Sequence, residues 1–205
     1  NGVKFPELVN DDAKRGLISG AAAQDPRLAF KLIGELGLKD SSQAVSGIMQ
    51  AAATAEMRNA SLAALREYAA ASADELIRDK TVSDALSGMT HQLTREGFIA
   101  ATRWLDSAGL SGKELEGFVR GGLSSGNRYE ETGKWIEWTA DKLPESSDTI
   151  RNLVRQWTRN DYQAAGKWLA ATPAGPTKDV SIRSYAETVS QYEPETAAQW
   201  AMTLP

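Results

Sequence analysis

The chain has 205 residues, no cysteine and a formal net charge of −4 at pH 7. The lack of cysteine excludes disulfides and thiolate chemistry, and the acidic balance disfavours a surface for duplex nucleic acid, because such surfaces are usually strongly basic. No apolar run approaches the roughly 20 residues of a transmembrane helix, so we expect no membrane insertion. The chain begins with Asn1 and Gly2, and we expect it to be a fragment or the mature part of a longer protein. The sequence does not indicate a cellular compartment.

The first predicted helix runs from Asp12 to Gln24, and the step Asp25-Pro26 starts the next one. An acidic N-cap followed by proline is a start signal, because proline lacks only an N–H group that would be unpaired there. Glu193-Pro194 marks the start of the last helix in the same way. Gly37 and Gly109 end helices because glycine tolerates a left-handed cap. Proline ends others, at Leu143-Pro144, Thr172-Pro173 and Leu204-Pro205.

A large residue recurs along the whole chain at spacings of 36, 36, 31, 33 and 32 residues. We call these residues the anchors: Leu32, Tyr68, Trp104, Trp135, Trp168 and Trp200. The residue three positions earlier is small in five of the six cases, and the residue six positions earlier is always bulky or cyclic. These offsets lie on one face of an α-helix, so each anchor belongs to a helix with a close-approach position. A period of this length, with a turn after each anchor, is typical of stacked two-helix repeats.

A second helix follows each anchor helix after the turn. We predict these helices over residues 42–57, 73–90, 111–124, 146–159 and 178–192. Their apolar faces predict core positions at Val45, Ile48, Met49, Leu76, Ile77, Leu86, Leu115, Phe118, Val119, Ile150, Leu153, Val154, Trp157, Ile182, Tyr185 and Val189.

Strand signals are nearly absent, and alanine, the best helix former, is abundant. We therefore expect an all-α fold, a right-handed superhelix of about five to six stacked helix pairs, that forms one domain over residues 1–205. Both ends of the chain fall inside the repeat cycle. Terminal repeats normally need a polar outer face, so we expect uncapped apolar faces through which copies of the chain could associate.

No catalytic signature stands out. His91 is the only histidine and has no second ligand at metal-site spacing, so we interpret it as a polar residue near a helix end. Paired carboxylates such as Glu130-Glu131, or Glu114 with Glu116, fall at predicted helix starts, where they stabilise the positive end of the helix dipole. No phosphate-binding glycine loop is present. We expect no cofactor, no metal and no enzymatic activity.

The tryptophans allow two interpretations. Exposed aromatic rings stack on sugars in some α/α proteins. Here Trp104, Trp135, Trp168 and Trp200 recur once per repeat beside a small residue, which is what packing between repeats requires. We therefore favour packing. Trp138 stands three positions out of register and belongs either to the buried stripe or to a surface contact.

The residue just before each anchor is the strongest candidate for binding. It is basic at four of six positions in an acidic chain: Lys31, Arg103, Lys134 and Lys167. Equivalent positions align when repeats stack, so these cations could form a column that attracts an acidic peptide or another anionic ligand. The alternative is an ordinary solvated helix face.

The C-terminal 75 residues carry a family resemblance. The stretch Ala164-Ala165-Gly166-Lys167-Trp168-Leu169-Ala170-Ala171-Thr172-Pro173 is echoed by Ala197-Ala198-Gln199-Trp200-Ala201-Met202-Thr203-Leu204-Pro205. This pattern resembles the degenerate A-x-x-W-x-x-x-L-P repeats of tetratricopeptide-like α-solenoids in large uncharacterised bacterial proteins. The resemblance implies stacked antiparallel helix pairs and carries over no binding residue.

Three functions follow as expectations. The first is a non-catalytic scaffold that binds a protein or peptide on its concave surface. The second is an accessory domain of an enzyme that acts on cell-wall glycan, with catalysis elsewhere in a longer chain. The third is an α/α toroid with its own hydrolase site, which needs two carboxyl groups across a cleft.

Overall fold

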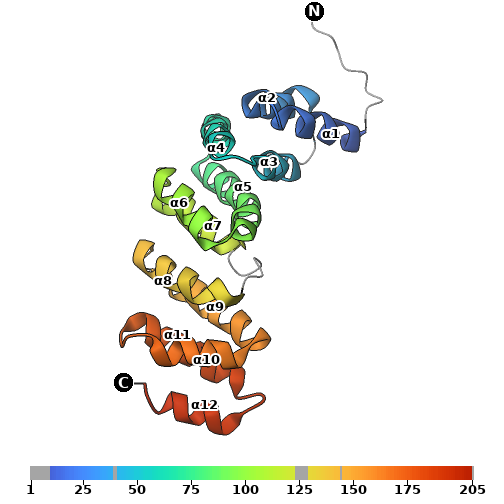
Figure 1. The fold of residues 1–205 in the computed structure, drawn as a ribbon. Coiled ribbons are helices and arrows are strands. Elements are labelled where there is room, and N and C mark those ends of the chain that lie inside the picture. The colour runs from blue at the N-terminus through green and yellow to red at the C-terminus, as the bar shows by residue number, and fades with distance from the viewer. Residues whose placement is uncertain (1–9, 39–40, 123–128, 144, 205) are drawn as a thin grey trace, which may run out of the picture. The chain divides into compact units, whose positions relative to one another are not determined.

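The computed structural model describes residues 10–38, 41–122, 129–143 and 145–204 (Figure 1). Within these ranges the regular structure comprises twelve α-helices and one 3-10 turn, with no strand, which confirms the expected all-α class. Two compact units can be distinguished: unit 1 contains residues 1–92 and 103–121, and unit 2 contains residues 93–102 and 122–205. Pro144 and Pro205, which we expected to end helices, lie outside the described residues.

Unit 1 is built from helices that contact both the next helix and the next but one. Its helices are α1 (Asp11–Ala22), α2 (Pro26–Leu36), α3 (Ser42–Gln50), α4 (Ala55–Ala70), most of α5 (Glu75–Glu96), the end of α6 (Phe98–Ser107) and α7 (Gly112–Gly122). Helix α1 packs on α2 and α3, and α2 packs on α3 and α4. Neighbour and next-neighbour contacts are the pattern that stacked helix pairs produce.

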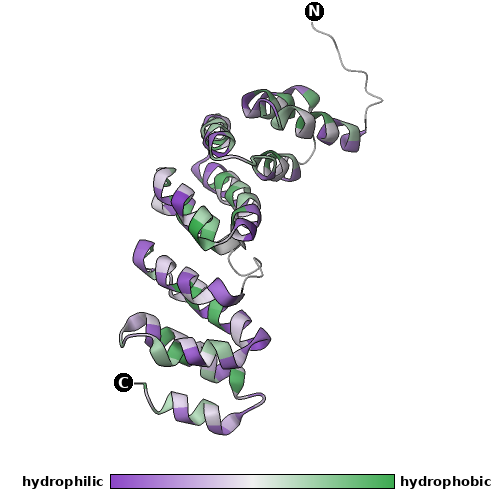
Figure 2. Ribbon diagram, viewed as in Figure 1, coloured by the Kyte–Doolittle hydropathy of each residue, from purple (hydrophilic) through white to green (hydrophobic). Residues whose placement is uncertain are grey.

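Unit 2 repeats this arrangement. It contains the end of α5, the start of α6, the 3-10 turn Tyr129–Glu131, α8 (Thr132–Lys142), α9 (Ser147–Asn160), α10 (Tyr162–Ala171), α11 (Pro176–Val189) and α12 (Pro194–Ala201). Each helix from α8 to α11 packs on the next, and α9 also packs extensively on α11. Figure 2 shows polar and apolar residues on each helix, as expected for helices with one buried face.

Local signals in the sequence place several helix ends correctly. The Asp25 carboxylate accepts hydrogen bonds from the backbone N–H groups of Arg27 and Leu28, at 2.9 and 3.3 Å, and so caps α2. Gly37 and Gly109 both have a φ of 59°, the left-handed conformation that favours glycine.

The predicted helix over residues 42–57 is wrong in its second half. Helix α3 ends at Gln50, and α4 begins at Ala55. The cause is Thr54, which has extended backbone dihedrals and whose hydroxyl accepts a hydrogen bond from the Met57 N–H at 3.2 Å. A threonine cap starts a new helix there instead of continuing the old one.

Most of the predicted core positions are buried. Thirteen of the sixteen lie in the core: Val45, Ile48, Met49, Leu86, Phe118, Val119, Ile150, Leu153, Val154, Trp157, Ile182, Tyr185 and Val189. Leu115 is half-buried.

Leu76 and Ile77 are not core residues, contrary to the prediction, because they are 81% and 57% exposed. The buried face of α5 is set by Leu86, Met89 and Leu93. Steps of three and four residues back from Leu86 lead to Val82, Asp79 and Glu75, so Leu76 and Ile77 fall off that face. The sequence pattern alone does not reveal this register, since the first turn of α5 is also apolar.

The anchor helices bury the positions around the anchor more consistently than the anchor itself. Trp104 and Trp135 are buried, whereas Leu32, Tyr68, Trp168 and Trp200 are half-buried. The small residue three positions earlier is fully buried at Ala29, Ala101 and Ala165. A small side chain there lets a neighbouring helix approach closely, as the repeat pattern predicts.

Candidate functional site

The anchor rings contact neighbouring helices. The Trp168 ring lies against α8 at Gly133, where an added Cβ would be only 2.5 Å from Trp168 Cδ1. The Trp168 indole N–H donates to Glu137 Oε1 at 3.1 Å. Trp135 packs edge-on against Phe98, with ring centroids 5.0 Å apart. These contacts confirm the packing interpretation for Trp168 and Trp135.

The other tryptophans behave alike. The Trp200 ring packs on Tyr185 at 5.9 Å, and Trp138 packs edge-on against Trp135 at 5.7 Å. In unit 1 the Trp104 indole N–H donates to Asn59 Oδ1 at 2.9 Å, which joins α6 to α4. The out-of-register Trp138 therefore belongs to the same aromatic packing as the anchor beside it.

Two of the carboxylates predicted to stabilise their own helix also reach the preceding anchor helix. Glu131, just before α8, accepts a hydrogen bond from the backbone N–H of Phe98 at 2.9 Å. Glu193, just before α12, accepts one from the Tyr162 hydroxyl at 2.7 Å. Hydrogen bonds from Tyr162 and Thr196 lower the pKa of Glu193, and the bond to Glu193 raises the pKa of Tyr162. Each contact joins the first residue of one anchor helix to the residue just before the next anchor helix.

All four basic positions singled out from the sequence are exposed. Lys31 and Arg103 belong to unit 1, and Lys134 and Lys167 belong to unit 2. Lys31 forms an i,i+4 ion pair with Glu35 at 3.4 Å. Within the described residues no ion pair involves Arg103, Lys134 or Lys167. Whether the four cations form one column therefore stays a prediction.

Lys134 and Lys167 lie on adjacent helices. Lys134 follows Gly133, and Lys167 precedes Trp168, the two residues through which α8 and α10 touch. Two carboxylates lie three residues from Lys134 along the chain: Glu137 accepts the Trp168 indole N–H, and Glu131 accepts the Phe98 N–H. Packing between helices thus engages both of the carboxylates that stand three residues from Lys134.

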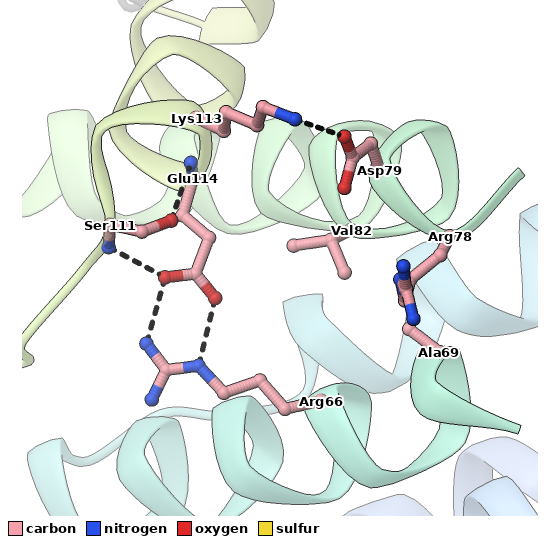
Figure 3. Close-up of a pocket in the computed structure, with 8 residues that line it drawn as sticks. All are labelled: Arg66, Ala69, Arg78, Asp79, Val82, Ser111, Lys113 and Glu114. Atoms are coloured by element: carbon pink, nitrogen blue, oxygen red, sulfur yellow. Dashed lines mark hydrogen bonds and ion pairs between the residues drawn. The ribbon is translucent and has the colours of Figure 1, made fainter. Parts of the chain in front are cut away.

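Unit 1 contains a pocket of about 200 Å³ between α4, α5 and α7 (Figure 3). Its lining combines three cations, two carboxylates, one hydroxyl and two aliphatic side chains: Arg66, Arg78, Lys113, Asp79, Glu114, Ser111, Ala69 and Val82. Sequence reasoning missed this site, since its residues come from three helices and share no short motif.

Both carboxylates of the pocket are already paired. Arg66 donates through Nε and Nη2 to the two oxygens of Glu114, each at 2.8 Å. Ser111 and Glu114 form a capping box at the start of α7: the Ser111 N–H donates to Glu114 at 2.7 Å, and the Glu114 N–H donates to Ser111 Oγ at 3.3 Å. Lys113 Nζ lies 2.7 Å from Asp79 Oδ2.

Electrostatics keep this ion pair charged. Burial alone would raise the pKa of Glu114, but hydrogen bonds from Arg66 and Ser111, with the nearby guanidinium charge, hold it below its usual value. The same bond raises the pKa of Arg66. The pair therefore stays ionised at neutral pH, and its carboxylate is not a free base.

Arg78 has no partner in the part of the chain that the structure describes. It is half-buried and lines the pocket, and Figure 3 shows it without an interaction to any other lining residue. A guanidinium offers five N–H donors and stays charged at all ordinary pH values. Arg78 is therefore the charged group of the pocket that is free to receive a ligand.

A second, more open hollow of about 320 Å³ lies in unit 2, between α8 and the turn before α11. Its lysine, Lys178, donates to the backbone oxygen of Thr172 at 2.8 Å, and its carboxylate, Glu137, is engaged by Trp168. The charged groups of this hollow are thus used in holding the turn and the repeat.

Among the described residues, no group of three or more His, Asp or Glu side chains could hold a metal ion. No helix in the same ranges has the length and apolar character needed to cross a membrane. Comparison with models of known protein families, with curated proteins and with solved structures finds no match to this chain.

Proposed function

We propose that this chain is a non-catalytic helical-repeat scaffold that binds an acidic segment of a protein partner. Its repeats would stack into a right-handed superhelix, as in tetratricopeptide-like solenoids, with the partner on the concave surface. Contacts between each helix and the next but one, within each unit, support a stacked architecture. The packed tryptophan rings lend no support to a carbohydrate site.

One observation carries the proposal: Lys134 and Lys167 are exposed, carry no ion pair within the described residues, and flank the contact between α8 and α10. Packed helices are about 8–10 Å apart. A peptide in the polyproline II conformation has three residues per turn and advances about 3.1 Å per residue, so side chains three residues apart lie on the same side, about 9 Å apart. Carboxylates three residues apart on such a peptide would therefore match the two ammonium groups.

The test is a titration of fluorescently labelled peptides into the full chain, followed by anisotropy. One peptide carries glutamates three residues apart, and a second carries the same composition with the glutamates adjacent. The double variant Lys134→Glu/Lys167→Glu should weaken binding of the first peptide at least about tenfold, because two attractions become repulsions.

The matched control is Arg159→Glu/Arg183→Glu, which changes the charge of unit 2 by the same amount at two exposed positions. Binding should fall only slightly in the control. Equal loss in both double variants would show that net charge alone attracts the peptide, and unchanged affinity in the first would remove the proposal.

A further inference from the structure

The pocket between α4, α5 and α7 has an excess of positive charge among its lining residues. Arg66 and Lys113 are each neutralised by a carboxylate of the pocket, Glu114 and Asp79. Glu75 adds a more distant contact to Lys113, at 3.6 Å, from outside the lining. None of these three ion pairs involves Arg78. The lining thus holds three cations and two carboxylates, which leaves one positive charge on Arg78.

Further donors face the same space. The Ser111 hydroxyl accepts from the Glu114 N–H, and its own proton has no acceptor among the described residues. Arg66 uses Nε and Nη2 for Glu114, and its Nη1 likewise has no acceptor there. A guanidinium presents paired N–H groups that match the two oxygens of a carboxylate. The free donors and the single excess charge fit a monoanion.

The remainder of the lining is aliphatic. Ala69 is buried, and Val82 is half-buried. The pocket volume of about 200 Å³ exceeds the roughly 150 Å³ of an engineered cavity that holds benzene. A ligand with a few carbon atoms attached to its anionic group would therefore cover Ala69 and Val82 while its charge meets Arg78.

We infer that this pocket binds a carboxylate borne on a short aliphatic chain, with Arg78 as the main recognition group. The ligand is either a free small carboxylic acid or the side chain of a glutamate in a partner protein. The two sources share the same chemistry. The inference concerns unit 1 and does not rest on Lys134 and Lys167, which belong to unit 2.

The experiment is a calorimetric titration of the full chain with butyrate, with butyramide, and with a short peptide containing one internal glutamate. Butyrate or the peptide should bind, and butyramide, which has the same shape without the charge, should not. Small ligands of this size bind with dissociation constants on the order of 1 mM. Stronger binding of butyrate identifies a free acid, and stronger binding of the peptide identifies a glutamate side chain.

Variants tie the binding to this pocket. Arg78→Gln should weaken carboxylate binding at least about tenfold, and Arg78→Lys should weaken it less, because the charge remains but the planar fork is lost. Val82→Phe should also prevent binding by filling the space. Lys80→Gln is the control, since Lys80 is exposed on the same helix and pairs with Asp84.

Two results would overturn the inference. One is the absence of binding by both butyrate and the peptide. The other is equal binding by the wild-type chain and by Arg78→Gln and Val82→Phe variants whose circular dichroism shows that they are folded. The Arg78→Gln variant should keep its full affinity for a peptide that binds only through Lys134 and Lys167. The two proposals can therefore fail separately.

Discussion

The two units hold their helices together in different ways. In unit 2 the anchors Trp135, Trp168 and Trp200 recur every 32–33 residues, and several contacts between helices are aromatic rings against glycine or another ring. In unit 1 the anchors are 36 residues apart. Several contacts between its helices are ion pairs, such as Arg66 with Glu114 and Lys113 with Asp79. These ion pairs line an open pocket between the helices, in which Arg78 has no ion-pair partner among the described residues. The difference lies in the kind of contact, because ion pairs between helices can leave a neighbouring cation available to a ligand.

The largest effect should come from removing a buried ring of unit 2. Trp135→Ala should lower the free energy of unfolding by about 3–5 kcal/mol, because the ring is 4% exposed and packs on both Phe98 and Trp138. Urea unfolding followed by circular dichroism measures the loss. Tyr68→Ala, at a half-buried anchor of unit 1, should lower the free energy of unfolding clearly less. Equal losses would show that the burial of an anchor does not set its contribution to stability.

Gly133 offers a sharper test of close packing. Gly133→Ala should lower the stability of unit 2 by about 1–3 kcal/mol, because the added Cβ would collide with the Trp168 ring. The matched change Gly34→Ala, in α2 of unit 1, meets no atom within 4 Å and should stabilise by about 0.4–1 kcal/mol. Amide hydrogen exchange measures both effects: it should become faster in α8 of the Gly133→Ala variant and slower in α2 of the Gly34→Ala variant. Stabilisation by both substitutions would contradict the glycine contact.

The contribution of the Arg66–Glu114 ion pair to the free energy of unfolding should depend on pH. Glu114→Gln should cost about 1–2 kcal/mol at pH 7, because Arg66 loses its charged partner while the capping contact is weakened. The pKa of Glu114 is lower in the folded chain than in the unfolded one. Its contribution is therefore complete above the unfolded value of about 4.3 and disappears as the pH falls through the folded value.

The difference in stability between wild type and Glu114→Gln should accordingly be constant near neutral pH and shrink below about pH 4. Urea unfolding at several pH values gives this curve. A difference that grows on acidification would mean that the carboxylate is not held in its charged form.

The smallest effect should come from the apolar residues that the structure leaves exposed. Leu76→Ser and Ile77→Ser should each change the free energy of unfolding by less than about 0.5 kcal/mol, because neither side chain is in the core of unit 1. Leu86→Ser on the same helix is the contrasting change, since Leu86 is fully buried. A large loss of stability in Leu76→Ser would show that Leu76 is a core residue, as the sequence pattern predicts.

The sequence predicts the helices better than it predicts the site. Signals that act within one turn, such as the Asp25 cap and the left-handed Gly37, identify helix ends because their physics is local. Periodicity identifies Ile48, Phe118 and Ile182 as core residues. It fails at Leu76 because the register of α5 is set by residues more than two turns away.

The candidate site depends on contacts between distant segments. Arg66 and Glu114 are 48 positions apart, and their pairing depends on how α4 and α7 pack. The sequence shows Glu114 only as an acidic residue in a first helical turn, and it distinguishes Arg78 in no way from any other arginine. Which cation remains unpaired becomes evident only when all of its neighbours are in place.

The most direct test of the contrast between the units is an NMR titration of the isotopically labelled full chain with butyrate. We predict saturable shifts at the Arg78 side-chain N–H and at the backbone amides of Ser111 and Val82, with the amides of α8 to α12 unchanged. Shifts that are absent at Arg78, or that spread evenly over α8 to α12, would contradict the proposal that the unpaired Arg78 of unit 1 forms the ligand site.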